Sequence, residues 1–233
     1  MADHRRSHRV LTDAGGELAY EAYLSTWARA FGEAERAAET SLDEYSMDQV
    51  GASFLAEVLP GGAGARVLAA FRDAYLEEWA RGVTAIPGLA AMLDALGARC
   101  TLAVVSNTHH ASLVHGLLHR VGIADAFKAV VTSVEFGRRK PCRTVFEHAL
   151  RLTGCAPGDA LFVGDSYVPD YVGPRAVGMP ALLIDPDARG PAPAEDRLAS
   201  VLEVGERLGA SCQRGQRTHR STGGGVAFGR VHG

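Results

Sequence analysis

Apolar side chains recur at helical spacing through the first third of the chain. The pattern covers about residues 9–59, is interrupted by Pro-Gly-Gly at 60–62, and resumes over about 64–81. Ser46 stands ahead of one apolar run, as a helix N-cap would. We therefore predict that residues 1–82 form an all-helical unit.

The pattern changes at Val83, after which short apolar runs alternate with helical segments. Continuous apolar runs bounded by turn residues are typical of strands buried on both faces of a parallel sheet. The runs predicted as strands cover residues 101–105, 129–132, 161–163 and 181–184. Because strand and helix alternate, the predicted fold class is α/β, with a Rossmann-like parallel sheet core over residues 83–208.

The end of the chain has a different composition. Residues 209–233 are rich in glycine, arginine and serine and contain no acidic residue. A segment of this kind offers little apolar surface to bury, so we expect a disordered tail.

The overall composition narrows the partners to be expected. The 233 residues are 47% hydrophobic and carry a formal net charge of −3, which favours neither a nucleic-acid nor a membrane partner. No apolar run approaches the roughly 20 residues that cross a bilayer, and the N-terminus lacks the apolar segment of a signal peptide. The cysteines form no C-x-x-C pair, so neither a zinc site nor a disulfide scaffold is indicated. We expect a cytoplasmic protein.

Two carboxylates follow the apolar run at 161–163. Gly164 lets the backbone turn at the strand end, and Asp165 and Asp170 lie five positions apart in the next loop. Ligands of parallel α/β sheets bind beyond the carboxyl ends of the strands, where this loop would lie. Hard oxygen ligands suit Mg²⁺, which would also offset the repulsion between the two acids. The alternative interpretation is a turn that only caps the next helix.

Further polar groups stand near other predicted strand ends. Ser106 and Asn107 follow the run at 101–105 and precede a helix, so hydroxyl, amide and helix N-terminus could seat a phosphate. Lys140 precedes Pro141, and a lysine beside a rigid helix start can reach into a site as a point charge. Taken singly, an ordinary N-cap and an exposed lysine explain these residues more simply. The order and strand context of all the motifs together are far more specific.

At this point the chain resembles the haloacid dehalogenase-like (HAD) hydrolase superfamily. The resemblance covers about residues 83–208 through the motifs Ser106-Asn107, Lys140-Pro141 and Gly164-Asp165 to Asp170. The preceding helical unit is similar to the cap of that superfamily. The Gly-Asp pair favours the phosphatase branch, because the dehalogenase branch generally lacks it and uses no metal.

The resemblance implies a role for each motif residue. Ser106 and Asn107 would bind the phosphoryl group, and Lys140 would be a catalytic residue that also holds the phosphate. Asp165 and Asp170 would bind Mg²⁺. The implied activity is a Mg²⁺-dependent phosphatase that hydrolyses a small phosphorylated metabolite, a phosphomonoester, through an aspartyl-phosphate intermediate.

The Asp-x-Asp-x-Thr loop that carries the nucleophile of this family is not found. Asp13 could mimic the nucleophile, but Gly15 and Glu17 replace the acid and the threonine expected after it. The residues ahead of Asp13 are too basic for a buried strand, so residues 4–14 are expected to form the first cap helix.

The central first strand of the sheet is accordingly expected to be absent, through a late start site, a deletion or a true pseudoenzyme. Its two neighbouring strands would then present unpaired backbone groups. We expect the chain as written to be poorly stable and inactive, and a longer natural product to be the phosphatase.

Other functions remain open on the sequence alone. A metal-free haloacid dehalogenase is one, and a catalytically dead or N-terminally truncated phosphate-binding protein is another. His115 and His119 share a helix face but lack further zinc ligands. His109 and His110, just after Asn107, could touch substrate, although a solvated loop is the simpler interpretation.

Overall fold

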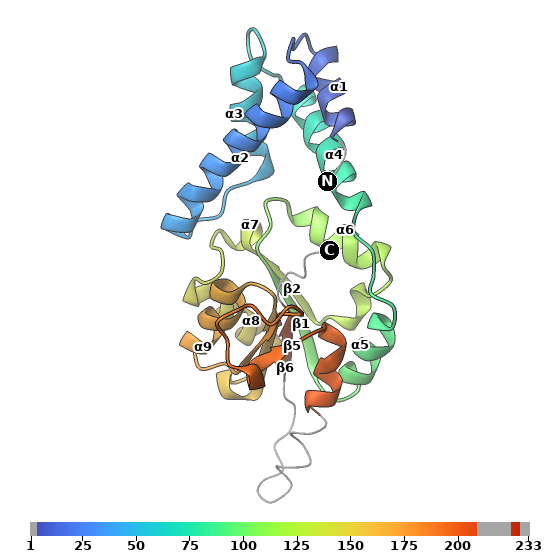
Figure 1. The fold of residues 1–233 in the computed structure, drawn as a ribbon, viewed down its shortest axis with the longest axis vertical. Helices are drawn as coiled ribbons and strands as arrows, with labels where there is room; N and C mark the ends of the chain where they lie inside the picture. The colour runs from blue at the N-terminus through green and yellow to red at the C-terminus, as the bar shows by residue number, and fades with distance from the viewer. Residues whose placement is uncertain (1–3, 209–224, 229–233) are drawn as a thin grey trace, which may run out of the picture.

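The computed structural model describes residues 4–208 and 225–228, and it shows a helical cap above an α/β core (Figure 1). The cap is the blue to cyan part of the ribbon, and the sheet of the core lies below it. Among the described residues, no helix combines the length and the apolar character that crossing a bilayer requires.

The cap packs around a cluster of aromatic rings. Its helices are α1 (Arg5–Asp13), α2 (Tyr20–Ser41), α3 (Met47–Val58) and α4 (Ala65–Arg81). The ring of Trp27 lies 5.2 Å from the rings of Phe54 and Phe71, and all three are at most 4% exposed. Ser46 caps α3 as expected: its hydroxyl accepts from the Gln49 N–H, and its own N–H donates to the Gln49 side chain.

A buried carboxylate on α4 holds the beginning of α1. Glu78 is 5% exposed and accepts hydrogen bonds from the backbone N–H of Arg6 at 2.5 Å and from the Ser7 hydroxyl at 2.9 Å. The first N–H groups of a helix have no partner within it, so a carboxylate placed there satisfies them and opposes the positive end of the helix dipole. The helix predicted for residues 4–14 is therefore present, and these residues are not a strand of the sheet.

The core is a parallel sheet with the strand order β2-β1-β6-β3-β4-β5. Its strands are β1 (Thr101–Ser106), β2 (Ala129–Thr132), β3 (Ala160–Gly164), β4 (Ala181–Ile184), β5 (Arg197–Leu198) and β6 (Gly225–Phe228). The strands expected from the sequence correspond to β1 to β4. The parallel pairing confirms the α/β fold class.

Helices cover both faces of the sheet. They include α5 (Leu89–Gly97), α6 (Ala111–Arg120), α7 (Ser133–Phe136), α8 (Arg143–Thr153) and α9 (Gly173–Ala176). Successive residues of a strand point to opposite faces. Accordingly Phe162 joins the cluster that contains Phe146 of α8, whereas Val163 joins the cluster that contains Leu93 of α5. The continuous apolar runs of the sequence thus reflect burial on two sides.

The centre of the sheet is occupied by β6, which comes from the segment expected to be disordered. This strand pairs in parallel with β1 on one side and with β3 on the other. Val226 is 2% exposed and Ala227 is 7% exposed. The expectation that β1 and β3 present unpaired edges is therefore wrong, because the strand between them comes from the C-terminal end of the chain and not from residues ahead of the cap.

The physical reason is that two facing open edges offer a full set of hydrogen-bond partners to any extended segment that reaches them. The sequence Gly-Val-Ala-Phe at 225–228 has no polar side chain, and Val226 and Ala227 are buried between the layers of the core. The remainder of the expected tail, residues 209–224 and 229–233, lies outside the described residues.

Candidate active site

The motif residues gather at the carboxyl edge of the sheet. Ser106 is the last residue of β1, and Gly164 is the last residue of β3, so both flank the end of β6. Lys140 reaches the same edge from the loop that precedes α8. In a parallel α/β sheet this edge is where ligands bind.

Lys140 is buried and paired with the second acid of the acidic loop. Its Nζ donates to Asp170 Oδ1 at 2.6 Å, and the two side chains are 2% and 1% exposed. The ammonium also lies 5.3 Å from the ring centre of Phe162, which suits a cation–π contact. The alternative of an exposed surface lysine is therefore excluded.

Asp170 is fixed by the geometry of its loop. It lies in a π-helical turn, Tyr167–Val172, and its Oδ2 accepts the backbone N–H of Ser166 at 3.1 Å. A Cβ on Gly164 would lie 2.5 Å from Asp170 Cγ and Oδ2. Gly164 is thus required by the close approach of this carboxylate to the end of β3.

Asn107 ties the first motif to the second. Its Oδ1 accepts the Lys140 N–H at 2.8 Å, and its Nδ2 donates to the Lys140 carbonyl at 3.1 Å. The Ser106 hydroxyl lies 3.4 Å from the Asn107 carbonyl and is 6% exposed as a residue. We call Ser106, Asn107 and Lys140, the residues expected from the sequence to bind phosphate, the phosphate seat. Because Asn107 bonds both the N–H and the carbonyl of Lys140, it also holds the lysine backbone in place.

Asp165 is the more accessible acid of the pair. It is half-buried, and its Oδ1 accepts the Ser166 hydroxyl at 3.3 Å. Carboxylate oxygens of this kind are the donors that Mg²⁺ prefers, with water and substrate completing the coordination. Within residues 4–208 and 225–228, no group of three or more His, Cys, Asp or Glu residues gathers for a metal. Asp165 therefore fits Mg²⁺ in the nature of its donors, whereas both oxygens of Asp170 also accept hydrogen bonds, from Lys140 and Ser166.

Asp13 lies elsewhere. It is exposed at the end of α1, and α1 is labelled at the top of the cap in Figure 1. The position gives it no contact with the carboxyl edge of the sheet in this arrangement. The structure therefore offers no support for Asp13 as a substitute nucleophile.

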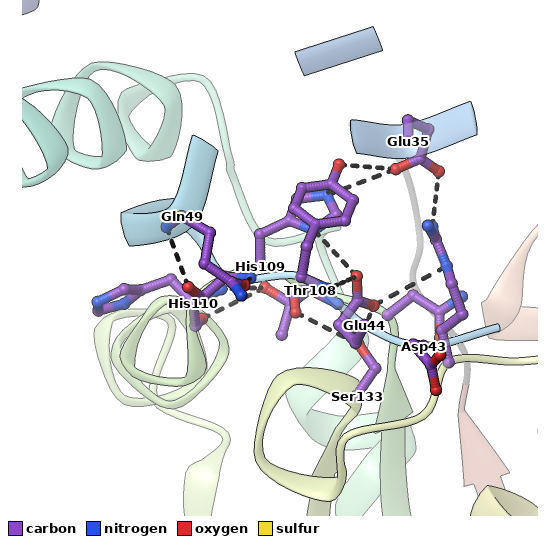
Figure 2. A network of polar contacts seen from close by, with 12 residues as sticks. Glu35, Asp43, Glu44, Gln49, Thr108, His109, His110 and Ser133 are labelled. Carbon is purple, nitrogen blue, oxygen red and sulfur yellow. Dashed lines mark hydrogen bonds and ion pairs between the residues drawn. The ribbon is translucent and has the colours of Figure 1, made fainter. Parts of the chain in front are cut away.

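A polar network joins the cap to the loops that carry the seat (Figure 2). Glu35 accepts from Arg139 Nη2 at 2.6 Å and from the Tyr45 hydroxyl at 2.8 Å. His109 stacks on Tyr45, with ring centres 4.2 Å apart, and its Nδ1 lies 3.2 Å from Glu44 Oε1. His109 is therefore part of the cap–core junction and not of a solvated loop.

Burial and hydrogen bonding act against each other on the titratable groups of this network. Burial raises the pKa of Glu35, but the hydrogen bonds from Arg139 and Tyr45 outweigh it, so the pKa lies below its ordinary value. Burial and the hydrogen bond to Glu35 raise the pKa of the Tyr45 phenol. Glu35 thus stays ionised and Tyr45 stays neutral, so the phenol can donate its hydrogen bond to the carboxylate.

Sequence reasoning missed Glu35 and Glu44 because no local signal marks them. Both lie in or after a long helix where acids are ordinary surface residues. Their partners in the core are from 65 to 104 positions away in the chain. A contact of that range leaves no periodicity or spacing to recognise.

A cavity of about 160 Å³ opens between cap and core beside this network. Its walls include Phe31 and Trp79 from the cap, and Thr108, His109 and His110 from the loop after β1. Because that loop directly follows Ser106 and Asn107, the cavity lies next to these residues.

A known protein family matches about two thirds of the chain, including the candidate site. The family described as haloacid dehalogenase-like hydrolase matches residues 30–184. The chain belongs to this family. Its match begins within the cap and extends through β4, so it includes every residue of the phosphate seat and the acidic loop.

Individual relatives of this HAD-like hydrolase align with shorter segments of the chain. This chain is 41% identical over 109 residues to the human haloacid dehalogenase-like hydrolase domain-containing protein 3, and the match covers 44% of this chain and 43% of that protein. It is 43% identical over 68 residues to a glyceraldehyde 3-phosphate phosphatase of Methanothermobacter thermautotrophicus, covering 29% and 30%. The matches thus span less than half of either relative.

Solved structures agree in fold. The 2-haloacid dehalogenase of Pseudomonas syringae pv. Tomato superposes with a TM-score of 0.67 at 19% identity, covering 89% of this chain and 91% of that chain. At this identity the likeness shows a shared fold and does not separate a phosphatase from a dehalogenase.

Proposed function

We propose that this HAD-like hydrolase is a Mg²⁺-dependent phosphatase of a small phosphomonoester. The observation that carries the proposal is the connected set of contacts at the carboxyl edge of the sheet. Asn107 is bonded to the backbone of Lys140, and Lys140 is paired with Asp170 of the acidic loop. A hydroxyl, an ammonium and an acidic pair at one edge suit a phosphoryl dianion and a divalent cation.

Each residue of the site has a definite part in this chemistry. Ser106 donates its hydroxyl to a phosphoryl oxygen, and the Lys140 ammonium offsets the negative charge of the bound group. Asp165 and Asp170 are the residues that would hold Mg²⁺, which supplies electrostatic stabilisation of the phosphoryl oxygens when bound. The sequence contains no Asp-x-Asp-x-Thr loop, so no residue is assigned as the nucleophile.

The phosphatase names among the relatives support the choice of phosphate. The relative from Methanothermobacter thermautotrophicus is a phosphatase by name, and its match is at 43% identity. The chain also has Gly164 and Asp165 at the end of β3, the pair that favours the phosphatase branch in the resemblance.

Release of phosphate from p-nitrophenyl phosphate tests the proposal. We expect Mg²⁺-dependent turnover, by this chain or by a form extended upstream in frame, that is abolished by EDTA and reduced at least about 100-fold by Asp165→Asn or Ser106→Ala. Asp159→Asn, an exposed acid ahead of β3, is the matched control and should keep the wild-type rate. A form extended upstream in frame is assayed in parallel, because activity in that form alone would trace the loss to the missing nucleophile loop.

No phosphate release by either form at high enzyme concentration would contradict the proposal. Halide release from a 2-haloacid without Mg²⁺ would identify a dehalogenase instead. Asp13→Asn is included in the series, and loss of turnover in that variant alone would restore Asp13 as the nucleophile.

A non-catalytic phosphate-binding protein is the second candidate, because β6 supplies no acid that could be the nucleophile. The strand at the centre of the sheet, residues 225–228, contains no acid. This candidate predicts binding of inorganic phosphate by calorimetry without turnover of any ester.

A further inference from the structure

A carboxylate from the cap is completely buried between segments of the core. Glu44 follows α2, and its side chain is 0% exposed. Figure 2 shows it between His109 and Ser133. The Ser133 hydroxyl donates to Oε2 at 2.5 Å, His109 Nδ1 lies 3.2 Å from Oε1, and Arg139 Nε lies 3.9 Å from Oε2. The partners come from three separate core segments.

Each of these segments adjoins the phosphate seat. The Ser133 Oγ that donates to Glu44 also accepts the backbone N–H of Thr108 at 2.9 Å. Thr108 and His109 directly follow Asn107, and Arg139 directly precedes Lys140. Glu44 is therefore linked through one or two residues to both of the loops that form the seat.

Main-chain hydrogen bonds also hold cap residues 42–47 against these loops. The Glu44 N–H donates to the Gly137 carbonyl at 3.1 Å, and the Arg139 N–H donates to the Leu42 carbonyl at 3.1 Å. On the other loop, the Met47 N–H donates to the His109 carbonyl at 2.7 Å. The cap residues 42–47 thus bridge the loop after β1 and the loop before α8.

The buried Glu44 carboxylate is stable only while the cap stays docked on both loops. An ionised carboxylate removed from water is stable only where hydrogen-bond donors and positive charge replace the lost hydration. Here the replacements come from three segments, so they are all available only while the cap is docked and both loops hold their positions. A change in either loop would leave the charge without compensation.

We propose that Glu44 is a positioning residue that couples docking of the cap to the geometry of the phosphate seat. The inference rests on the proposed function only in so far as Ser106, Asn107 and Lys140 bind phosphate. Coupling between two events is reciprocal, so phosphate in the seat must in turn tighten the docking of residues 42–47.

Binding of inorganic phosphate to the full chain, measured by calorimetry, is the first test. Glu44→Ala removes the carboxylate, and we expect phosphate to bind about 10-fold more weakly, within the usual range of such couplings. Glu57→Ala is the matched control, because Glu57 is an exposed cap acid paired with Arg29. It should bind phosphate as the wild type does.

Hydrogen exchange supplies a measurement that a merely structural role would not change. In the wild type, phosphate should slow exchange of the Glu44 and Met47 N–H groups, which bond to the core. In Glu44→Ala this protection by phosphate should be lost. Ser133→Ala removes the relay to Thr108 and should weaken phosphate binding in the same direction, whereas Ser112→Ala, on the exposed start of α6, should not.

The possible results separate this inference from the proposed function. Wild-type phosphate affinity in both Glu44→Ala and Ser133→Ala would overturn the coupling and leave the phosphatase proposal standing. A wild-type chain that binds no phosphate would overturn both. If Glu44→Ala does not fold, Ser133→Ala decides the matter, since it leaves the carboxylate and its contact with His109 in place.

Discussion

Lys140 and Asp170 form an ion pair that is almost completely removed from solvent, with Nζ 2.6 Å from Oδ1. The pair joins the loop before α8 to the acidic loop after β3. A phosphoryl group that binds Lys140 must therefore share its ammonium with Asp170. The same contact also makes the site a part of the stability of the core.

Breaking this pair from one side should destabilise the protein strongly. Lys140→Met leaves Asp170 buried without its cation, and we expect a loss of about 3–5 kcal/mol in the free energy of unfolding. Urea denaturation measures it, with Lys128→Met, an exposed lysine, as the control.

The double variant Lys140→Met/Asp170→Leu removes both charges and should recover much of this loss, because no unpaired charge remains. A double variant as unstable as the sum of the two single variants would show that the residues do not interact.

The close approach of Asp170 to β3 should make Gly164 sensitive to a single added methyl group. The Cβ of Gly164→Ala would collide with the Asp170 carboxylate, so the acidic loop must shift, and we expect a loss of about 1–3 kcal/mol together with weaker Mg²⁺ binding. Gly158→Ala has nothing within 4 Å of its Cβ and is the control. Equal thermal stability and equal Mg²⁺ affinity in the two variants would show that Gly164 serves only the turn.

The strand at the centre of the sheet should be indispensable to the core. A chain ending at Gly224 lacks β6, so β1 and β3 lose their shared partner and their backbone groups become unpaired. We expect a lower melting temperature and fast hydrogen exchange along both strands.

A chain ending at Phe228 keeps β6 and is the matched control for this truncation. It should retain the slow exchange of β1 and β3. If the chain ending at Gly224 melted and exchanged like the one ending at Phe228, β6 would contribute nothing to the sheet in solution.

The junction of cap and core should weaken in acid. The pKa of Glu35 is lowered in the folded protein, so its contribution to stability is present above its unfolded value, about 4.3. This contribution is lost as the pH falls through the folded pKa, when the protonated carboxyl no longer attracts Arg139. The protection of the Met47 N–H, taken as the intrinsic exchange rate divided by the observed rate at each pH, should therefore fall between about pH 5 and pH 3.

Glu35→Gln should flatten this pH dependence, because the amide has no proton to gain in that range. Glu35 is about a third exposed, so the effect is expected to be modest. A pH dependence that is unchanged in Glu35→Gln would assign the acid sensitivity to another group.

The strand-end motifs could be predicted because they depend on local order. The apolar run at 161–163 ends at Gly164 and delivers Asp165 and Asp170 whatever the rest of the chain does. The alternation of strand and helix then requires parallel pairing, which brings Ser106 to the same edge. The contact of Lys140 with Asp170 follows from that arrangement.

Other features could not be predicted because they depend on hydrogen bonds and ion pairs between segments that are far apart in the sequence. Residues 225–228 have too few apolar positions to indicate a strand by themselves, and they form one because β1 and β3 present open edges on either side. Glu44 looks like a surface acid in the sequence, and only the folded chain surrounds it with Ser133, His109 and Arg139.

The sequence by itself thus determined the α/β alternation, the helical cap and the residues at the strand ends, since periodicity and turn chemistry act over a few neighbouring positions. Only the tertiary structure decided which segment lies at the centre of the sheet and how the cap is held over the site. Both outcomes come from buried backbone groups and a buried charge that must find partners, and those partners lie far away along the chain.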